Sequence, residues 1–386
     1  MNLLIKKIEK TLFELKNWIE REEYKGYDPY DGLNSKIFRY FTKGKFSRIA
    51  IIQFFKKCPF NLRRFFMIRK DFNPKGLGLI VVGYLNLYKK YKMKEFLEKG
   101  NSILSLLIAL ASKGYSGYCW GYNFDWQSRA FFVPAGVPNV ICTSFVADAF
   151  LEYYKIFRDE KYLNVAISSC NFIVRDLNIK ETPEGICFSY TPVDNSEIHN
   201  ANLLAAALLA KVFHFTKKEQ FFSFSKKAAN FSIKFQAQDG AWYYGNAENQ
   251  KWVDNFHTGF NLVALSEIVR YTGISDFVYN IKRGVDYYRR FFFVKDVIPK
   301  YYNNKMYPID IHSVAQSIIT FIRLREFFEK GINRAIDVAL WGIENMRSKE
   351  GYFYFQKHVL YTNKIPYMRW SQAWMFYALS FLNLFI

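Results

Sequence analysis

Three of the five histidines recur at nearly equal spacing along the chain. His199, His257 and His312 are 58 and 55 residues apart, and each begins an apolar helical run. Imidazole serves as a general acid or base near neutral pH, and the partial positive charge of a helix N-terminus favours its neutral form. The spacing therefore predicts three acid or base groups at one site. For any single histidine, the alternative is a capping role or a hydrogen-bonded place in the core.

Carboxylates precede all three histidines, and those ahead of His199 are Asp194 and Glu197. Asp254 lies three residues before His257, and Asp310 lies two residues before His312. An aspartate in this position can cap the helix that follows, whereas sugar chemistry uses pairs of proton-transfer groups around the reacting carbon. We predict that Asp254, together with Asp125 in an unusual aromatic window, assists the histidines in catalysis.

The window from 120 to 129 (WGYNFDWQSR) combines two tryptophans, an aspartate and an arginine. Indole faces stack on sugar rings, and a guanidinium holds a carboxylate or phosphate through two parallel hydrogen bonds. A similar mixture recurs in later segments. The predicted substrate-binding residues are Trp120, Trp126, Arg129, Asn200, Trp242, Tyr244, Arg369, Trp370 and Gln372.

A repeat must position these residues. Polar residues followed by an apolar helical run begin at 142, 199, 257, 312 and 369, at spacings of 57, 58, 55 and 57, and a sixth run covers residues 76–88. Between consecutive runs lie amphipathic stretches at 93–112, 161–177, 218–235, 276–292 and 331–346. Each unit has the length of a helical hairpin with one buried and one half-solvated helix.

The repeat predicts an all-α fold, an (α/α)6 toroid of six helical hairpins with short β-ribbon loops at its mouth. We expect a single domain over 1–386, in which 71–386 form the hairpins and 1–70 supply the first outer helix from 3–22 or from 46–57. Glycine-aromatic turns at 184–190, 239–245 and 350–355 mark the mouth. An open α-solenoid of the same hairpins is the alternative.

Several chemistries lack their motifs. Neither GxxxxGK[ST] nor GxGxxG occurs, so a nucleotide-phosphate loop is not expected. The histidines and the five scattered cysteines include no HxxxH or CxxC pair, so we predict no metal and no cofactor. Apolar runs end near nine residues and the N-terminus lacks the apolar core of a signal peptide, which predicts a cytoplasmic protein with reduced thiols.

The charge points to an anionic partner. Lys and Arg number 54 against 34 Asp and Glu, a formal net charge of +20, and 20% of the residues are aromatic. The basic residues are dispersed and no nucleic-acid reader module is present, so we expect no specific nucleic acid. The predicted partner is an acidic or lipid-linked oligosaccharide, and the charge also allows peripheral association with the inner face of a membrane.

Four segments, 120–129, 134–143 (PAGVPNVICT), 253–262 (VDNFHTGFNL) and 367–377 (YMRWSQAWMFY), resemble the VpsJ-like polysaccharide biosynthesis proteins. The resemblance spans about residues 70–386 and implies a role in capsule or exopolysaccharide synthesis. More remotely, the hairpin ring resembles six-hairpin glycosidases, uronyl epimerases and N-acylglucosamine 2-epimerases. The last group works through paired histidines, a role that would fall on His257 and His312.

Three hypotheses for function follow. The first is a carbohydrate-active enzyme of cell-surface polysaccharide biosynthesis, an epimerase, lyase or hydrolase with acid/base chemistry. The second is a non-catalytic glycan-binding or scaffold toroid at the membrane surface. The third, an isoprenoid cyclase or prenyltransferase relative, would use the aromatic lining to stabilise carbocations, but no DDxxD-like cluster appears.

Overall fold

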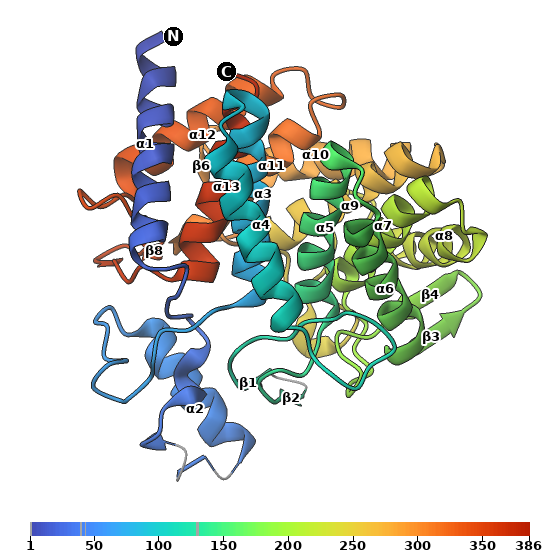
Figure 1. The fold of residues 1–386 in the computed structure, drawn as a ribbon, viewed down its shortest axis with the longest axis horizontal. Helices are drawn as coiled ribbons and strands as arrows, with labels where there is room; N and C mark the ends of the chain where they lie inside the picture. The colour runs from blue at the N-terminus through green and yellow to red at the C-terminus, as the bar shows by residue number, and fades with distance from the viewer. Residues whose placement is uncertain (1, 39–40, 43, 129–130) are drawn as a thin grey trace.

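The computed structural model describes residues 2–38, 41–42, 44–128 and 131–386, and these ranges contain thirteen α-helices. Six hairpins make up the fold (Figure 1). The inner helices are α3 (Pro74–Tyr91), α5 (Val140–Phe157), α7 (His199–Thr216), α9 (Asn255–Thr272), α11 (Ile311–Arg323) and α13 (Trp374–Leu382), the last continuing a π-helix, η4 (Met368–Ala373). The outer helices are α1 (Asn2–Arg21), α4 (Lys94–Ala109), α6 (Glu160–Asp176), α8 (Glu219–Lys234), α10 (Val278–Phe291) and α12 (Gly331–Asn345).

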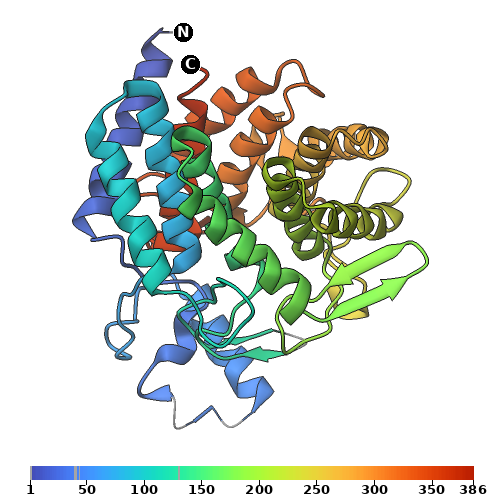
Figure 2. The ribbon, with the colours of Figure 1, turned by 45° about the vertical axis from the view of Figure 1, so that its right-hand side comes forward.

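The inner helices form a closed ring. Each contacts the next along the chain, and α13 packs against α3, so the last inner helix meets the first. This closure confirms the predicted (α/α)6 toroid and excludes the open solenoid. In Figures 1 and 2 both chain termini lie together at one end of the ring, and α2 lies at the other end.

The N-terminal region contributes two separate parts. Helix α1 packs against α12 and α13, in the outer position that the repeat leaves vacant. Helix α2 (Lys45–Lys57) instead contacts the short helix η1 (Asp31–Asn34) and the strand β1 (Trp126–Gln127) at the mouth. Of the two segments expected to supply the first outer helix, the structure therefore uses the first. None of the described helices is both long and apolar enough to cross a membrane.

Local sequence explains where the inner helices begin. Asn73, Asn139, Asp254 and Asp310 each accept a hydrogen bond from the backbone of the first turn of α3, α5, α9 and α11, respectively. Short acceptor side chains satisfy the free N–H groups at a helix start. Asp254 and Asp310 therefore take the capping role that the sequence left as an alternative. Beyond these caps, the small and aliphatic residues of the inner helices are buried on nearly all sides.

Small antiparallel ribbons join the helices at the mouth. They pair β1 with β2 (Phe132–Val133), β3 (Ile179–Thr182) with β4 (Gly185–Phe188), β5 (Phe293–Val294) with β6 (Ile298–Pro299), and β7 (Ile309–Asp310) through β8 (Gln356–Lys357) with β9 (Thr362–Asn363). The ribbon expected near 184–190 is present, whereas described residues 239–244 form a turn without a strand. Gly240 has φ of 100°, and a Cβ there would lie 2.3 Å from Arg283 O, so this turn requires glycine.

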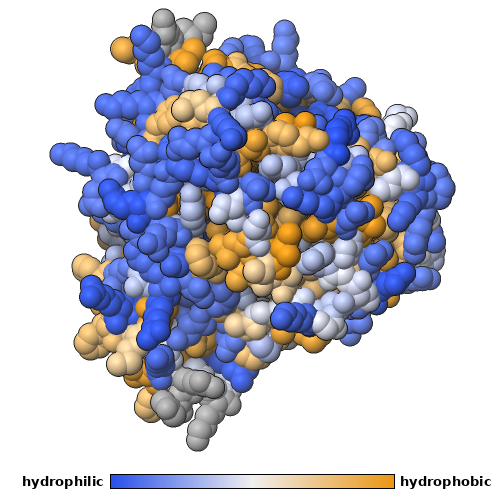
Figure 3. All heavy atoms as spheres, viewed as in Figure 1, coloured by the Kyte–Doolittle hydropathy of each residue, from blue (hydrophilic) through white to orange (hydrophobic). Residues whose placement is uncertain are grey.

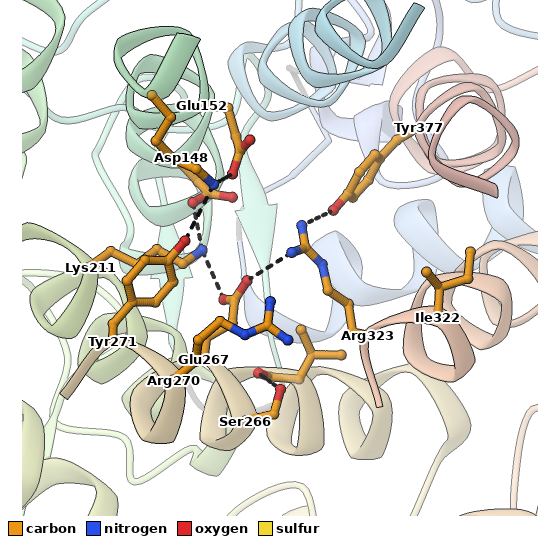
Figure 4. A network of polar contacts seen from close by, with 12 residues as sticks. Asp148, Glu152, Lys211, Ser266, Glu267, Arg270, Tyr271, Ile322, Arg323 and Tyr377 are labelled. Atoms are coloured by element: carbon orange, nitrogen blue, oxygen red, sulfur yellow. Dashed lines mark hydrogen bonds and ion pairs between the residues drawn. The ribbon is translucent and has the colours of Figure 1, made fainter. Parts of the chain in front are cut away.

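A buried ionic network links the inner helices deeper in the ring than their first turns (Figure 4). Lys211 Nζ of α7 lies 2.6 Å from Asp148 Oδ1 of α5 and 2.8 Å from Glu267 Oε2 of α9. Arg323 of α11 lies 3.8 Å from Glu267 and donates to Tyr377 Oη of α13 at 3.2 Å. Alternating charges thus connect four consecutive inner helices, and the hydrogen bond to Tyr377 adds a fifth, although the sequence pattern of these helices is dominated by apolar residues.

Candidate functional site

A cavity of about 750 Å³ opens at the mouth of the ring. Its wall combines α2, the β1–β2 region, the loops before α9 and α11, and the first turns of the inner helices. All six inner helices contribute the residue two positions after their N-cap. These residues are Lys75, Ile141, Asn200, Phe256, His312 and Arg369.

This shared position corrects the predicted register of histidines. Only His312 occupies it, whereas His199 lies one position before it and His257 one position after it. One residue rotates a side chain by about 100° around a helix. His257 still reaches the cavity, but His199 points into the hairpin, where its ring lies 5.3 Å from that of Phe235.

His199 is therefore a buried structural residue. It is 1% exposed, its Nε2 lies 3.1 Å from Asn246 Oδ1, and its Nδ1 has no hydrogen-bond partner within the described residues. Burial lowers the pKa of His199 from 6.5 to about 4. The prediction that three histidines face one site is wrong for His199. The nearly equal spacing of the histidines could not show that His199 lies one residue before the position that faces the cavity.

The depressed pKa of His199 predicts part of the acid sensitivity. The folded protein binds fewer protons than the unfolded chain at this group between pH 6.5 and 4, so its contribution to stability is lost as the pH falls through that window. The loss amounts to about 3 kcal/mol in the free energy of unfolding. Urea unfolding from pH 7 to 4 should show a steeper decline for the wild type than for His199→Gln. Parallel curves would contradict this assignment.

His257 is held by the carboxylate that caps its helix. Asp254 Oδ1 accepts the His257 backbone N–H at 3.0 Å, and Asp254 Oδ2 lies 2.6 Å from His257 Nδ1. The indole N–H of Trp252 donates to the same Oδ2 at 2.9 Å. Asp254 is 2% exposed, so these contacts fix its orientation. The arrangement orients the imidazole and leaves its Nε2 for a ligand in the cavity.

His312 lies among aromatic rings at the cavity wall. Its ring stacks on Phe256 at 4.6 Å and on Trp374 at 4.5 Å, with Trp370 edge-on at 4.7 Å. Neither ring nitrogen has a hydrogen-bond partner within the described residues. Burial, together with the charges of Lys75 and Arg369, lowers the pKa of His312 well below 6.5, so the imidazole is neutral at pH 7.

Lys75 is a cavity residue that the sequence analysis missed. It is 3% exposed, and its Nζ lies 4.5 Å from the ring centroid of Phe145, 5.1 Å from Trp374 and 5.5 Å from Phe260. Burial and the charge of Arg369 lower the pKa of Lys75 well below 10.5. A buried amine that faces a cavity in this way is suited to meet an anionic group of a ligand.

The position of Lys75 can be predicted by counting residues from the N-cap of its helix. Asn73-Pro74 is a clear helix start, because asparagine is a preferred N-cap and proline is favoured at the first helical position. Lys75 follows its cap by the same two residues as His312 follows Asp310. Aligning the repeats on their histidines, and not on their N-caps, does not show this shared position two residues after the cap.

Aromatic side chains form much of the remaining wall. Tyr244 stacks on Trp252 with centroids 4.5 Å apart, and the Tyr244 ring also lies 4.6 Å from that of His257. Trp126 packs against Tyr190 at 5.6 Å on another part of the wall. Trp126, Tyr244 and Trp370 thus lie at the cavity as predicted, and Asn200 joins them with a buried Oδ1 that has no partner among the described residues.

Other predicted binding residues serve the core instead. Trp120 is fully buried and its indole donates to Leu107 O at 2.7 Å, while Trp242 is 2% exposed and donates to Ser232 O at 2.9 Å. Gln372 is fully buried; its side chain accepts a hydrogen bond from the Phe353 backbone N–H and donates one to the Phe353 C=O, each at 2.8 Å. Their polar atoms complete backbone hydrogen bonds, which corrects the prediction that they contact substrate.

Three further predictions concern charged residues. Arg369 reaches the cavity, but its Nε and Nη2 donate to the Asp28 carboxylate at 2.6 and 2.7 Å. These two donors are therefore already used within the protein. Asp125 accepts the Ala135 backbone N–H at 2.8 Å, and this contact joins the residue before β1 to the segment after β2 instead of facing the cavity. Arg129 lies outside the described residues.

The cavity is electropositive. Among the described residues that line it, five are lysine or arginine, whereas Asp254 is the one carboxylate. The basic residues are Lys56, Lys57, Lys75, Lys305 and Arg369. Six helix N-termini add their partial positive charges at the same place. Asp310 lies just behind this wall, and burial raises its pKa to about 6 despite hydrogen bonds from Gln356 and Trp370.

Comparison with known proteins shows the fold. Cellobiose 2-epimerase from Bacillus thermoamylovorans superposes with a TM-score of 0.64 at 14% identity, covering 81% of this chain and 87% of the epimerase. A GH76 α-mannanase from Bacteroides thetaiotaomicron gives 0.62 at 10% identity, covering 81% and 86%. An unsaturated glucuronyl hydrolase specific for heparin gives 0.60 at 13% identity, covering 82% and 87%. All share the α/α-toroid. The sequence itself matches no protein-family model and no curated protein.

Proposed function

We propose that this protein is a sugar epimerase or isomerase that acts on an anionic glycan by proton abstraction and return. The observation that carries the proposal is the pairing of His257 with Asp254 at 2.6 Å, beside a neutral His312, in one aromatic and electropositive cavity. Two imidazoles in one cavity can act as base and acid in turn. The toroidal neighbours, which include a cellobiose epimerase, support sugar chemistry.

The two histidines have complementary surroundings. The ring of Phe256 lies 4.3 Å from His257 and 4.6 Å from His312, so both imidazoles adjoin the same aromatic side chain. With Nδ1 of His257 held by Asp254, its Nε2 takes the proton from the carbon next to a sugar carbonyl. Protonated His257 then returns the proton to the neighbouring carbon, which completes isomerisation; in epimerisation the neutral His312 is instead the base, and protonated His257 donates to the other face of the same carbon. Aromatic faces of Tyr244 and Trp370 support the sugar ring.

Glycoside hydrolysis fits this wall less well. Most glycosidases use two carboxyl groups flanking the scissile bond. Among the described lining residues only Asp254 offers one, and its Oδ2 is already engaged by His257 and Trp252. Carbocation chemistry fits less well still, because the basic side chains around the cavity would destabilise a cationic intermediate.

The substrate is proposed from the charge of the cavity. Lys75, Lys56 and the helix N-termini favour a carboxylate or phosphate on the sugar, and one toroidal neighbour acts on a glucuronyl substrate. An acidic or lipid-linked glycan of capsule or exopolysaccharide synthesis, as the VpsJ-like resemblance implies, meets this requirement.

Deuterium exchange tests the reaction. The purified protein is incubated in D2O with cellobiose, D-mannose or D-glucuronate, and the C2 proton is followed by NMR. Enzyme-dependent loss of that signal supports proton abstraction and return. Cleavage without exchange would assign a hydrolase, and binding without any change would assign the non-catalytic glycan-binding toroid.

Lys75 should determine the preference for charge. Lys75→Met is expected to raise KM for an anionic sugar about tenfold or more, because one charge-assisted contact is lost. The same variant should change KM for a neutral sugar of the same ring much less. Steady-state exchange rates over a range of each sugar separate the two cases. An equal rise in KM for both sugars would assign Lys75 to packing alone.

A further inference from the structure

The segment before the first inner helix carries an extreme charge. Between residues 35 and 70 the sequence has eleven Lys or Arg and no Asp or Glu, so this short region holds more than half of the net charge of +20. The expectation that the basic residues are dispersed over the outer helices and the Lys-rich N-terminus does not single out this segment. Of the described cations in this segment, Arg63 pairs with Asp31 and Lys70 with Glu22. Lys45, Lys57 and Arg64 are exposed.

The same segment exposes large apolar side chains. Phe46 is 86% exposed, Phe65 77% and Phe60 72%, and Phe41 and Met67 are also exposed. Such side chains are normally scattered singly over a protein surface. In the space-filling view, pale orange side chains adjoin blue ones at the lower left, where α2 and its neighbouring loops lie in Figure 1 (Figure 3).

Helix α2 shows how this surface relates to the cavity. Phe46, Ala50 and Phe54 recur every fourth residue and are exposed, so they form an apolar stripe on one helix face. Ile49 and Lys56, on a different face of the same helix, line the cavity. The exposed stripe therefore borders the cavity mouth.

We propose that the basic-aromatic surface formed by the described residues between 35 and 70 docks the protein onto an anionic phospholipid membrane. Phenylalanine and methionine side chains gain by entering the boundary between headgroups and acyl chains, while lysine and arginine are attracted to anionic headgroups. The stripe on α2 and the exposed Phe65 supply the first contribution, and Lys45, Lys57 and Arg64 supply the second. Charge complementarity favours a membrane with negative surface potential over a neutral one.

Docking in this way brings the cavity mouth next to the membrane surface. The substrate of the proposed epimerase or isomerase would then be a glycan attached to a membrane lipid, a step that rests on the proposed function. The docking surface itself does not depend on it. Phe46 and Phe54 do not line the cavity, so exchange on a free sugar in solution should be unchanged when they are replaced.

Vesicle flotation of the full chain tests the docking. The wild type should float with vesicles of phosphatidylcholine mixed with phosphatidylglycerol and stay behind with phosphatidylcholine alone. Phe46→Ser/Phe54→Ser and Lys45→Glu/Arg64→Glu should each weaken binding by about tenfold or more. Tyr279→Ser and Lys94→Glu, at the exposed first turns of α10 and α4, are matched controls that should bind like the wild type.

Three outcomes would overturn the proposal. One is the absence of flotation with anionic vesicles at physiological salt. The other is equal flotation of the wild type and both pairs of variants, which would assign any binding to diffuse charge. Binding to a single-stranded RNA with no vesicle binding would also reject the membrane in favour of a nucleic acid. If the wild-type protein floats with anionic vesicles but catalyses no exchange, the proposed function is rejected and the docking proposal stands.

Discussion

His257→Ala is expected to lower the rate of deuterium exchange at the sugar carbon by about 10²–10⁴-fold, the usual contribution of a positioned acid or base. The structure supplies the reason, because His257 is the one cavity imidazole whose Nδ1 is held by a carboxylate, Asp254, in the described chain. Asp254→Asn keeps the shape but weakens this hold, so a smaller loss is expected. NMR exchange assays under saturating sugar measure both effects.

A matched control isolates chemistry from folding. His214 lies at the last turn of α7, away from the cavity, so His214→Ala should retain wild-type exchange and stability. His312→Gln should also slow exchange, because the neutral imidazole beside Phe256 is the second proposed proton carrier. Full activity of His257→Ala with normal circular dichroism would remove His257 from catalysis and overturn the proposed pairing of the two histidines.

Lys211→Met is expected to lower the free energy of unfolding by about 3–5 kcal/mol, the usual cost of removing one partner from a buried ion pair. Lys211 is 6% exposed and lies between Asp148 and Glu267 at 2.6 and 2.8 Å. Although burial opposes its charged form, these carboxylates raise the pKa of Lys211 above its ordinary value. Its removal leaves two carboxylates facing each other in the ring interior, and urea unfolding at pH 7 measures the loss.

Two companion variants sharpen this result. Lys226→Met on the outer helix α8, where the side chain is 43% exposed, should change stability by less than about 0.5 kcal/mol. The double change Asp148→Leu/Lys211→Met should recover much of the loss, because it removes both partners of one ion pair and leaves Glu267 with Arg323. A small effect of Lys211→Met by itself would show that water reaches the network and screens its charges.

The closed ring follows from regular features of the sequence. The six apolar runs, the amphipathic stretches between them and the caps at Asn73, Asn139, Asp254 and Asp310 are local properties, and each is preserved in the fold. Aromatic recognition was also partly predictable, since Trp126, Tyr244 and Trp370 lie at the cavity. The resemblance to VpsJ-like proteins stays a prediction, because the structural neighbours share the fold at low identity.

Side-chain direction was not accessible from composition and spacing. A repeat that is known to within one residue places a helix correctly but leaves the direction of its side chains uncertain by about 100°. His199 and His257 lie at different positions from their N-caps and therefore have different surroundings. Trp120 and Trp126 occupy one short window, yet the first completes a core hydrogen bond and the second faces the cavity. Residue type alone does not separate a binding aromatic from a core aromatic.

The sequence by itself determined the hairpin repeat, the helix starts and the excess of positive charge, because these depend on periodicity and local hydrogen bonding. Only the tertiary structure decided which residues meet. Asp28 and Arg369 are 341 positions apart but form a bidentate pair, and Lys75 joins His312 at the mouth only because α3 closes the ring against α13. Such partners are set by ring closure, a long-range packing event that no local pattern encodes.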